Sequence, residues 1–150
     1  MTLKLWEKNG WIRPHQSSPQ EIAGLLSIVD RDLADSQGKI SSDWQFGIAY
    51  NAALKLCTVL LHASGYRPEK NLQHFRTLAV LPVILGDERK ADAAYLDACR
   101  IKRNTVEYDM AGVATEQDAQ ELLAFAKQLR YDVLAWLKRN HPNLIPNTKS

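Results

Sequence analysis

The fold of this chain is decided most clearly by residues 115–140, TEQDAQELLAFAKQLRYDVLAWLKRN. Apolar residues recur in this stretch at the spacing of one helix face. They are Ala119, Leu122, Ala126, Leu129, Val133 and Leu137. The pattern predicts one long helix from Thr115 to about Asn140, stopped by His141-Pro142.

Two helices with clear boundaries are predicted further upstream. Ser18-Pro19 provides a cap followed by a proline in the first turn, and the helix that follows is expected to end at Gly38. Ser42-Asp43 opens the next helix, which Gly65 is placed to end. In that second helix the small residues Gly47, Ala49 and Ala52 would let another helix approach closely, either inside the protein or from a second copy.

Between residues 70 and 110 the chain predicts two more helices. The first begins near Asn71, turns Phe75 inward and ends or kinks at Pro82, because proline cannot continue a helix interior. The second runs from about Glu88 to Tyr108. No segment alternates with period two for long enough to predict a strand. The first sixteen residues have no clean period, and Trp6, Trp11 and Ile12 are expected to pack as a flap.

These patterns predict one all-α domain over residues 1–150, with a core at about 18–141 and a flexible tail at about 143–150. Because the connections are short, the expected arrangement is an antiparallel four- or five-helix up-and-down bundle. A chain of 150 residues buries a core without disulfides. Its 45% apolar and 24% charged residues are typical of a globular protein.

Composition also bears on the compartment and on cofactors. The N-terminal residues lack the order of a secretory signal, and no apolar run reaches the roughly 18 residues of a membrane span. Cys57 and Cys99 lie among apolar residues, which is typical of buried thiols in a reducing cytoplasm. No Cys/His cluster has the spacing of a zinc site: His15 and His141 fall in turns and His62 near a helix end. We therefore expect a cytoplasmic protein without a metal or cofactor.

Several polar groups gather near the end of the fourth helix, in the run Arg103-Asn104-Thr105-Val106-Glu107-Tyr108-Asp109. On a helical wheel Arg103 lies beside apolar residues, so it needs a carboxylate, a carbonyl oxygen or an anionic ligand. One interpretation is an ion pair with Glu107 one turn later. The other is an anion site that also involves Asn104, Asp109 and His74, although a lone helical histidine such as His74 is more often structural.

The helix from Tyr50, the Leu60–Pro68 exit and the Arg103-Asn104 pair together resemble the HEPN family (higher eukaryotes and prokaryotes nucleotide-binding). The resemblance covers about residues 20–140, and Glu107-Tyr108-Asp109 is similar to the SAV-6107-like branch. It implies a dimeric helical protein that binds RNA or a nucleotide, in a toxin–antitoxin or defence system. Many members are metal-independent ribonucleases, and others are non-catalytic partners of a small nucleotidyltransferase.

By this resemblance the catalytic residues would be Arg103, Asn104 and Tyr108, with Arg103, Glu107, Asp109 and His74 binding the ligand. The histidine of the family's motif is replaced by Tyr108, which is a poor base because the reference pKa of tyrosine is near 10. Positions 103 and 108 are also about 140° apart on a regular helix. Their side chains converge only if the helix breaks or a second subunit contributes. A ribonuclease, an interaction module of the same fold and an unrelated helical bundle therefore all stay open.

Overall fold

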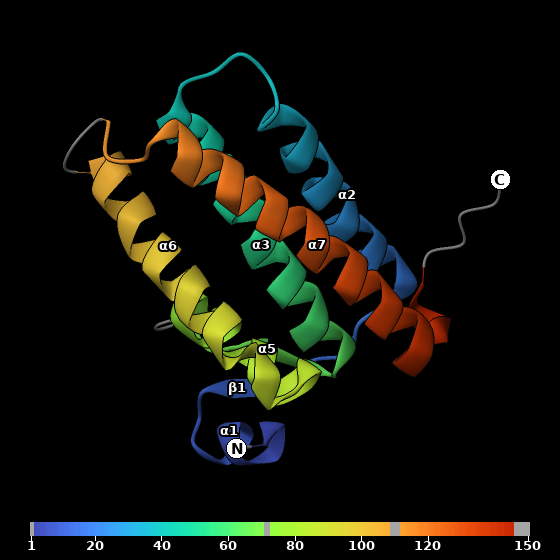
Figure 1. The fold of residues 1–150 in the computed structure, drawn as a ribbon. Coiled ribbons are helices and arrows are strands. Elements are labelled where there is room, and N and C mark those ends of the chain that lie inside the picture. The colour runs from blue at the N-terminus through green and yellow to red at the C-terminus, as the bar shows by residue number, and fades with distance from the viewer. Residues whose placement is uncertain (1, 71–72, 109–111, 146–150) are drawn as a thin grey trace, which may run out of the picture.

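The computed structural model describes residues 2–70, 73–108 and 112–145. They form an all-α protein with one very small sheet (Figure 1). In chain order the elements are α1 (Leu3–Lys8), β1 (Ile12–Pro14), α2 (Pro19–Asp35), α3 (Ser42–Ala63), β2 (Tyr66–Pro68), α4 (Gln73–Leu78), α5 (Val80–Leu85), the 3-10 turn η1 (Asp87–Arg89), α6 (Lys90–Tyr108), α7 (Glu116–Asn140) and the 3-10 turn η2 (Pro142–Leu144).

Side-chain caps fix where the long helices begin. Ser18 and Ser41 each accept a hydrogen bond from a backbone N–H in the first turn of α2 and α3. Thr115 and Asp118 form a reciprocal capping box at the start of α7. The predicted starts at Ser18 and Thr115 are thus confirmed, because a hydroxyl before an apolar periodic run satisfies N–H groups that the helix leaves unpaired.

Helix α3 is the centre of the molecule and packs against α2, α6 and α7 (Figure 1). It is apolar on most of its circumference, which is typical of a helix enclosed by others. Ala49 and Ala52 are fully buried, so these small residues serve the internal core. Gly47 does not, because a Cβ built there would meet no atom within 4 Å.

By length and composition, α3 is also the one helix among the described residues that could cross a membrane. Its most apolar window is 67% buried inside the protein. Burial of this kind is what the central helix of a globular core requires.

The small sheet joins two distant parts of the chain, and the sequence patterns did not predict it. Strands β1 and β2 pair antiparallel, with Ile12 opposite Pro68 and Arg13 opposite Arg67. Three residues are too few for a period of two to be recognised. Helix α1 was also missed, yet Trp6 and Ile12 are buried in the core as the expected flap required.

The chain between α3 and α6 differs from its prediction in two ways. The helix is interrupted at Ala79, between α4 and α5, and Pro82 lies inside α5. The reason is that a proline ring clashes with the carbonyl four residues earlier, which here belongs to Leu78. Phe75 was expected to face inward but is 37% exposed. The expected cap at Asn71 lies outside the described residues.

Candidate functional site

Two described cationic side chains that lack a carboxylate partner, Lys55 and Arg67, line one hollow together with two histidines. This basic cavity has a volume of about 190 Å³. It is lined from α3 by Leu54, Lys55, Thr58 and His62, from β2 by Arg67 and Pro68, and from α4 by His74 and Thr77. Lys55, Arg67 and His74 form no ion pair with any carboxylate in the described part of the chain. The positive charges of Lys55 and Arg67 are therefore not neutralised locally.

Two arginines of α6 add to this positive field. Burial lowers the pKa of His74, and the charges of Arg103, Lys55 and Arg100 lower it further. Arg100 is partly neutralised, since its Nε donates to Asp97 Oδ1 at 2.8 Å. His74 is consequently neutral near pH 7 and sits beside several positive charges.

The Arg103 side chain packs beside the core residue Tyr50 and places its charge close to His74. Its guanidinium carbon is 5.6 Å from the centre of the Tyr50 ring, and its Nε atom is buried. This environment agrees with the wheel analysis, which placed Arg103 beside apolar residues. The structure thus brings Arg103 near His74, two of the predicted ligand-binding residues from different helices.

The other predicted site residues are placed only in part. Asn104 is half-buried on α6. Tyr108 ends α6, but its side chain and that of Glu107 lie outside the described part of the structure, as does Asp109 altogether. The alternative ion pair between Arg103 and Glu107 therefore stays a prediction.

Tyr50 and Asn51 are neighbouring polar residues of α3. The Nδ2 of Asn51 donates to Asp32 Oδ2 at 2.6 Å. The Tyr50 side chain is 1% exposed, and its hydroxyl has no hydrogen-bond partner among the described residues. Burial raises the pKa of Tyr50, and the charges of Arg103 and Arg100 only partly oppose that rise.

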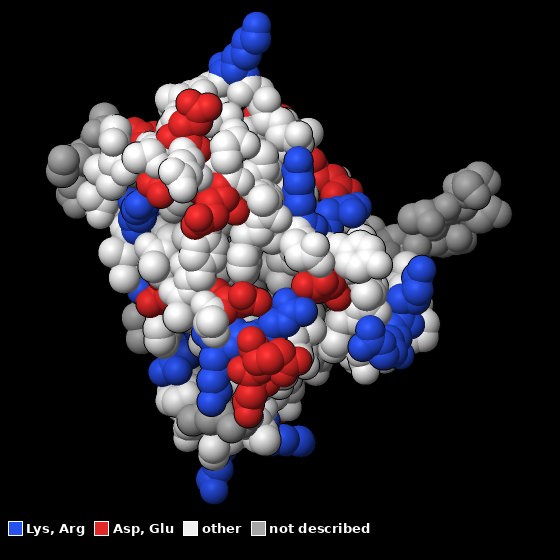
Figure 2. Space-filling model, viewed as in Figure 1, with Lys and Arg blue, Asp and Glu red and all other residues white. Residues whose placement is uncertain are grey.

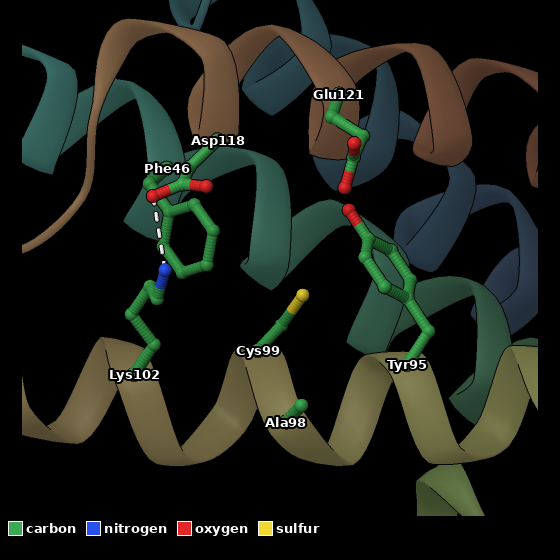
Figure 3. A pocket seen from close by; sticks show the side chains of 7 residues that line it. All are labelled: Phe46, Tyr95, Ala98, Cys99, Lys102, Asp118 and Glu121. Atoms are coloured by element: carbon green, nitrogen blue, oxygen red, sulfur yellow. Dashed lines mark hydrogen bonds and ion pairs between the residues drawn. The ribbon is translucent and has the colours of Figure 1, made fainter.

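A second cavity, of about 140 Å³, lies between α6 and α7 (Figure 3). Lys102 Nζ binds Asp118 Oδ2 there at 2.9 Å, and the Tyr95 hydroxyl points towards Glu121. Burial raises the pKa of the Cys99 thiol to about 11, so the thiol is protonated near neutral pH. This cavity therefore holds an ion pair but no activated nucleophile.

On the face that carries α7, positive and negative side chains are mixed. Figure 2 shows Lys and Arg side chains interspersed with Asp and Glu over the face that carries α7. Arg130 of α7, for example, is paired with Asp30 through an Nε–Oδ1 contact of 2.6 Å. Towards the C-terminal end of α7, Arg130 lines a further hollow together with Lys138 and Arg139.

Sequence reasoning identified Arg103 and His74 but missed Lys55, Arg67 and Arg100. These residues are spread over 46 positions of the chain, from 55 to 100, with no common motif. Only the packing of α3, β2, α4 and α6 brings them together. Comparisons with protein-family models, with curated proteins and with solved structures found no match to this chain.

Proposed function

We propose that this protein binds the phosphate groups of RNA or of a nucleotide in the basic cavity lined by Lys55, Arg67 and His74. The observation that carries the proposal is that Lys55 and Arg67, two cations without carboxylate partners among the described residues, line one hollow close to the charges of Arg100 and Arg103. Such charges repel one another when no ligand is bound, and an anion removes that repulsion. A phosphate group is the anion that guanidinium groups bind best, through two parallel hydrogen bonds.

Arg103 is the residue on which the proposal depends most. Its buried Nε and the nearby Tyr50 ring hold the guanidinium in a partly desolvated position, where a charged hydrogen bond is stronger than in water. Asn104 and the half-exposed Arg100 would complete the phosphate contacts from the same helix.

The same arrangement suggests a route to metal-independent RNA cleavage. His74 is neutral near pH 7, so its imidazole can accept the proton of a ribose 2′-hydroxyl. The 2′-oxygen then bonds to phosphorus, the bond to the 5′-oxygen breaks, and water protonates the leaving oxygen. Arg103 would stabilise the charge that develops on the phosphate oxygens. His74 would thereby do the work of the histidine that is missing near Tyr108.

The proposal also covers the fold type, the location and the biological role of the protein. It comprises an antiparallel up-and-down bundle of the HEPN type, a cytoplasmic location and a role in a toxin–antitoxin or defence system. The alternative is a non-catalytic interaction module, such as the partner of a minimal nucleotidyltransferase or of an antitoxin. That alternative predicts binding without cleavage, or no RNA binding by the isolated chain.

The test is incubation of the purified protein with a mixed RNA pool in the presence of EDTA, with binding and cleavage measured separately. Arg103→Ala should weaken RNA binding roughly 10- to 100-fold, since a hydrogen bond to a charged group contributes about 1.5–3 kcal/mol. Arg103→Lys should restore only part of it, because the ammonium lacks the planar fork. His74→Ala should abolish cleavage and reduce binding less.

Arg139→Ala is the matched control, because Arg139 is an exposed arginine at the other end of the chain. It removes the same charge and should leave binding nearly unchanged. Equal losses for Arg103→Ala and Arg139→Ala would mean that only net charge matters, and the cavity would then not be the site. Thermal unfolding of each variant shows whether a loss of binding is a loss of structure.

We also propose that the protein forms a homodimer, in which two copies of Arg103 serve one ligand across a two-fold axis. The support is the resemblance together with the position of Arg103 near the end of α6. Light scattering at micromolar concentration should give about twice the 17.0 kDa mass of one chain. A mass of one chain would contradict the dimer and leave the cavity proposal intact.

A further inference from the structure

Three potential metal ligands from separate parts of the chain meet beside the small sheet. His15 directly follows β1, Glu21 lies in the first turn of α2, and His62 lies in the last turn of α3. Their ligand atoms all lie within 4.8 Å of one another. Glu21 Oε2 is 2.8 Å from His15 Nε2 and 2.9 Å from His62 Nδ1.

The backbone around these residues is held by hydrogen bonds that do not involve the three side chains. The N–H of His15 donates to the carbonyl of Gly65 at 2.8 Å, and the Ser17 hydroxyl donates to the carbonyl of His62 at 2.9 Å. Ser18 caps α2 and so fixes the turn that carries Glu21. The two imidazoles and the carboxylate are therefore positioned before any ligand arrives.

We propose that His15, Glu21 and His62 form a binding site for a divalent first-row metal ion, with Zn²⁺ as the ion that this ligand set fits. Two imidazoles and one carboxylate are a set of three protein ligands that leaves a fourth position for solvent. The side chains are 21%, 31% and 15% exposed, so the site is sheltered but reachable from water. The proposal goes beyond the function proposed above and does not depend on it.

Only a small movement is needed to admit the ion. With metal–ligand distances of about 2.0–2.2 Å, ligand atoms around a tetrahedral zinc lie roughly 3.3–3.5 Å apart. The two contacts of Glu21 would thus lengthen by about half an ångström as the ion replaces the shared protons, and the ring nitrogens of His15 and His62, which lie within 4.8 Å of each other, would come to the same spacing. The two imidazole rings, with centres 4.7 Å apart and planes at 51°, already face the same carboxylate.

The competing interpretation is a His–Glu–His hydrogen-bond network whose only role is to hold α2 against the end of α3. The network requires the same contacts, so geometry alone does not separate the two. Cation binding separates the two interpretations, because a hydrogen-bond network alone does not bind one metal ion per chain.

The experiment is a titration of the untagged, EDTA-treated full chain with Co²⁺, followed by visible absorption. We expect one Co²⁺ per chain with the intense visible band of four-coordinate cobalt, and displacement of that band by one equivalent of Zn²⁺. Glu21→Gln, His15→Ala and His62→Ala should each weaken Co²⁺ binding by more than about 100-fold, because even residues that only support a ligand are worth 10- to 100-fold. Glu21→Gln keeps the shape and one hydrogen-bond acceptor, which guards against a result caused by misfolding.

His141→Ala is the matched control, since it removes a histidine outside the cluster. It should bind Co²⁺ as the wild type does. Absence of a stoichiometric band, or equal binding by wild type and Glu21→Gln, would overturn the metal site. RNA binding in EDTA with the Arg103 variants tests the basic cavity separately, so either proposal can fail while the other stands.

Discussion

The buried hydroxyl of Tyr50 is the residue whose environment is hardest to justify by folding alone. Placing a hydroxyl in the core without a partner costs about 1–3 kcal/mol, and among the described residues Tyr50 has none. Arg103 lies beside the same ring, with its guanidinium carbon 5.6 Å from the ring centre.

Tyr50→Phe should therefore raise the free energy of unfolding by about 1 kcal/mol, because it removes the unpaired hydroxyl and keeps the ring. Urea denaturation of the two proteins measures this. A variant less stable than the wild type would show that the hydroxyl has a partner in the folded protein.

At the level of single residues, the sequence predicted what depends on local pattern and missed what depends on packing. Arg103 was recognisable because it interrupts an apolar arc of its own helix. Lys55 and Arg67 were not, since nothing in their neighbourhoods distinguishes them from ordinary surface cations. His15 and His62 are 47 positions apart, and the expectation of no metal site followed from looking for closely spaced ligands.

Among the elements, α7 has the most regular packing. Leu129 is 2% exposed on its inner face, whereas Tyr131 two positions later is 71% exposed. Leu129→Ala should lower the free energy of unfolding by roughly 2–5 kcal/mol, through lost burial and the cavity left behind. Tyr131→Ala is the control and should change it by less than about 0.5 kcal/mol. Similar losses in urea denaturation for both variants would mean that the inner face has been misassigned.

The start of α7 should make stability depend on acid. Hydrogen bonding to the Thr115 N–H and contact with Lys102 lower the pKa of Asp118. The unfolded chain then holds the Asp118 proton more tightly than the folded one. The stabilisation is therefore present above about pH 4, the ordinary value for aspartate, and is lost as the pH falls through the lower pKa of the folded state.

Asp118→Asn should accordingly be less stable than the wild type at pH 6, and the difference should shrink as the pH approaches 2. Unfolding free energies across this range give the result. Asp35→Asn is the control, because Asp35 is exposed and its side chain contacts no described ion-pair partner. If the difference in unfolding free energy between the wild type and Asp118→Asn does not vary with pH, the assigned role of Asp118 is contradicted.

Element by element, the long helices were predictable because each carries an apolar period, and α2, α3 and α7 also begin at a side-chain cap. Helices α2, α6 and α7 begin within a few residues of their predicted starts. The short elements were not predictable: α1 has six residues and each strand has three. The break between α4 and α5 lies at Ala79, three residues before Pro82, because the proline ring clashes with the carbonyl of Leu78. Short elements are stabilised by their tertiary contacts, which a local pattern does not contain.

For the whole molecule, the apolar α3 decides the architecture, because an element that is apolar on most sides must be surrounded. The all-α class follows from this and from the helical periods of its neighbours. The position of the N-terminal segment beside the end of α3 does not follow from these patterns, because it depends on the pairing of residues 12–14 with residues 66–68.

That pairing has a consequence for how the protein opens. The β1–β2 contact closes a loop of more than fifty residues yet is held by few hydrogen bonds. The segment before α2 should therefore detach in a partial unfolding event whose free energy is far below that of global unfolding. Amide hydrogen exchange should then be much faster at His15 and Glu69, whose N–H groups bond across this junction, than along α3. Saturating Zn²⁺ should slow exchange at His15 selectively, because an ion held by both His15 and His62 binds only the closed form.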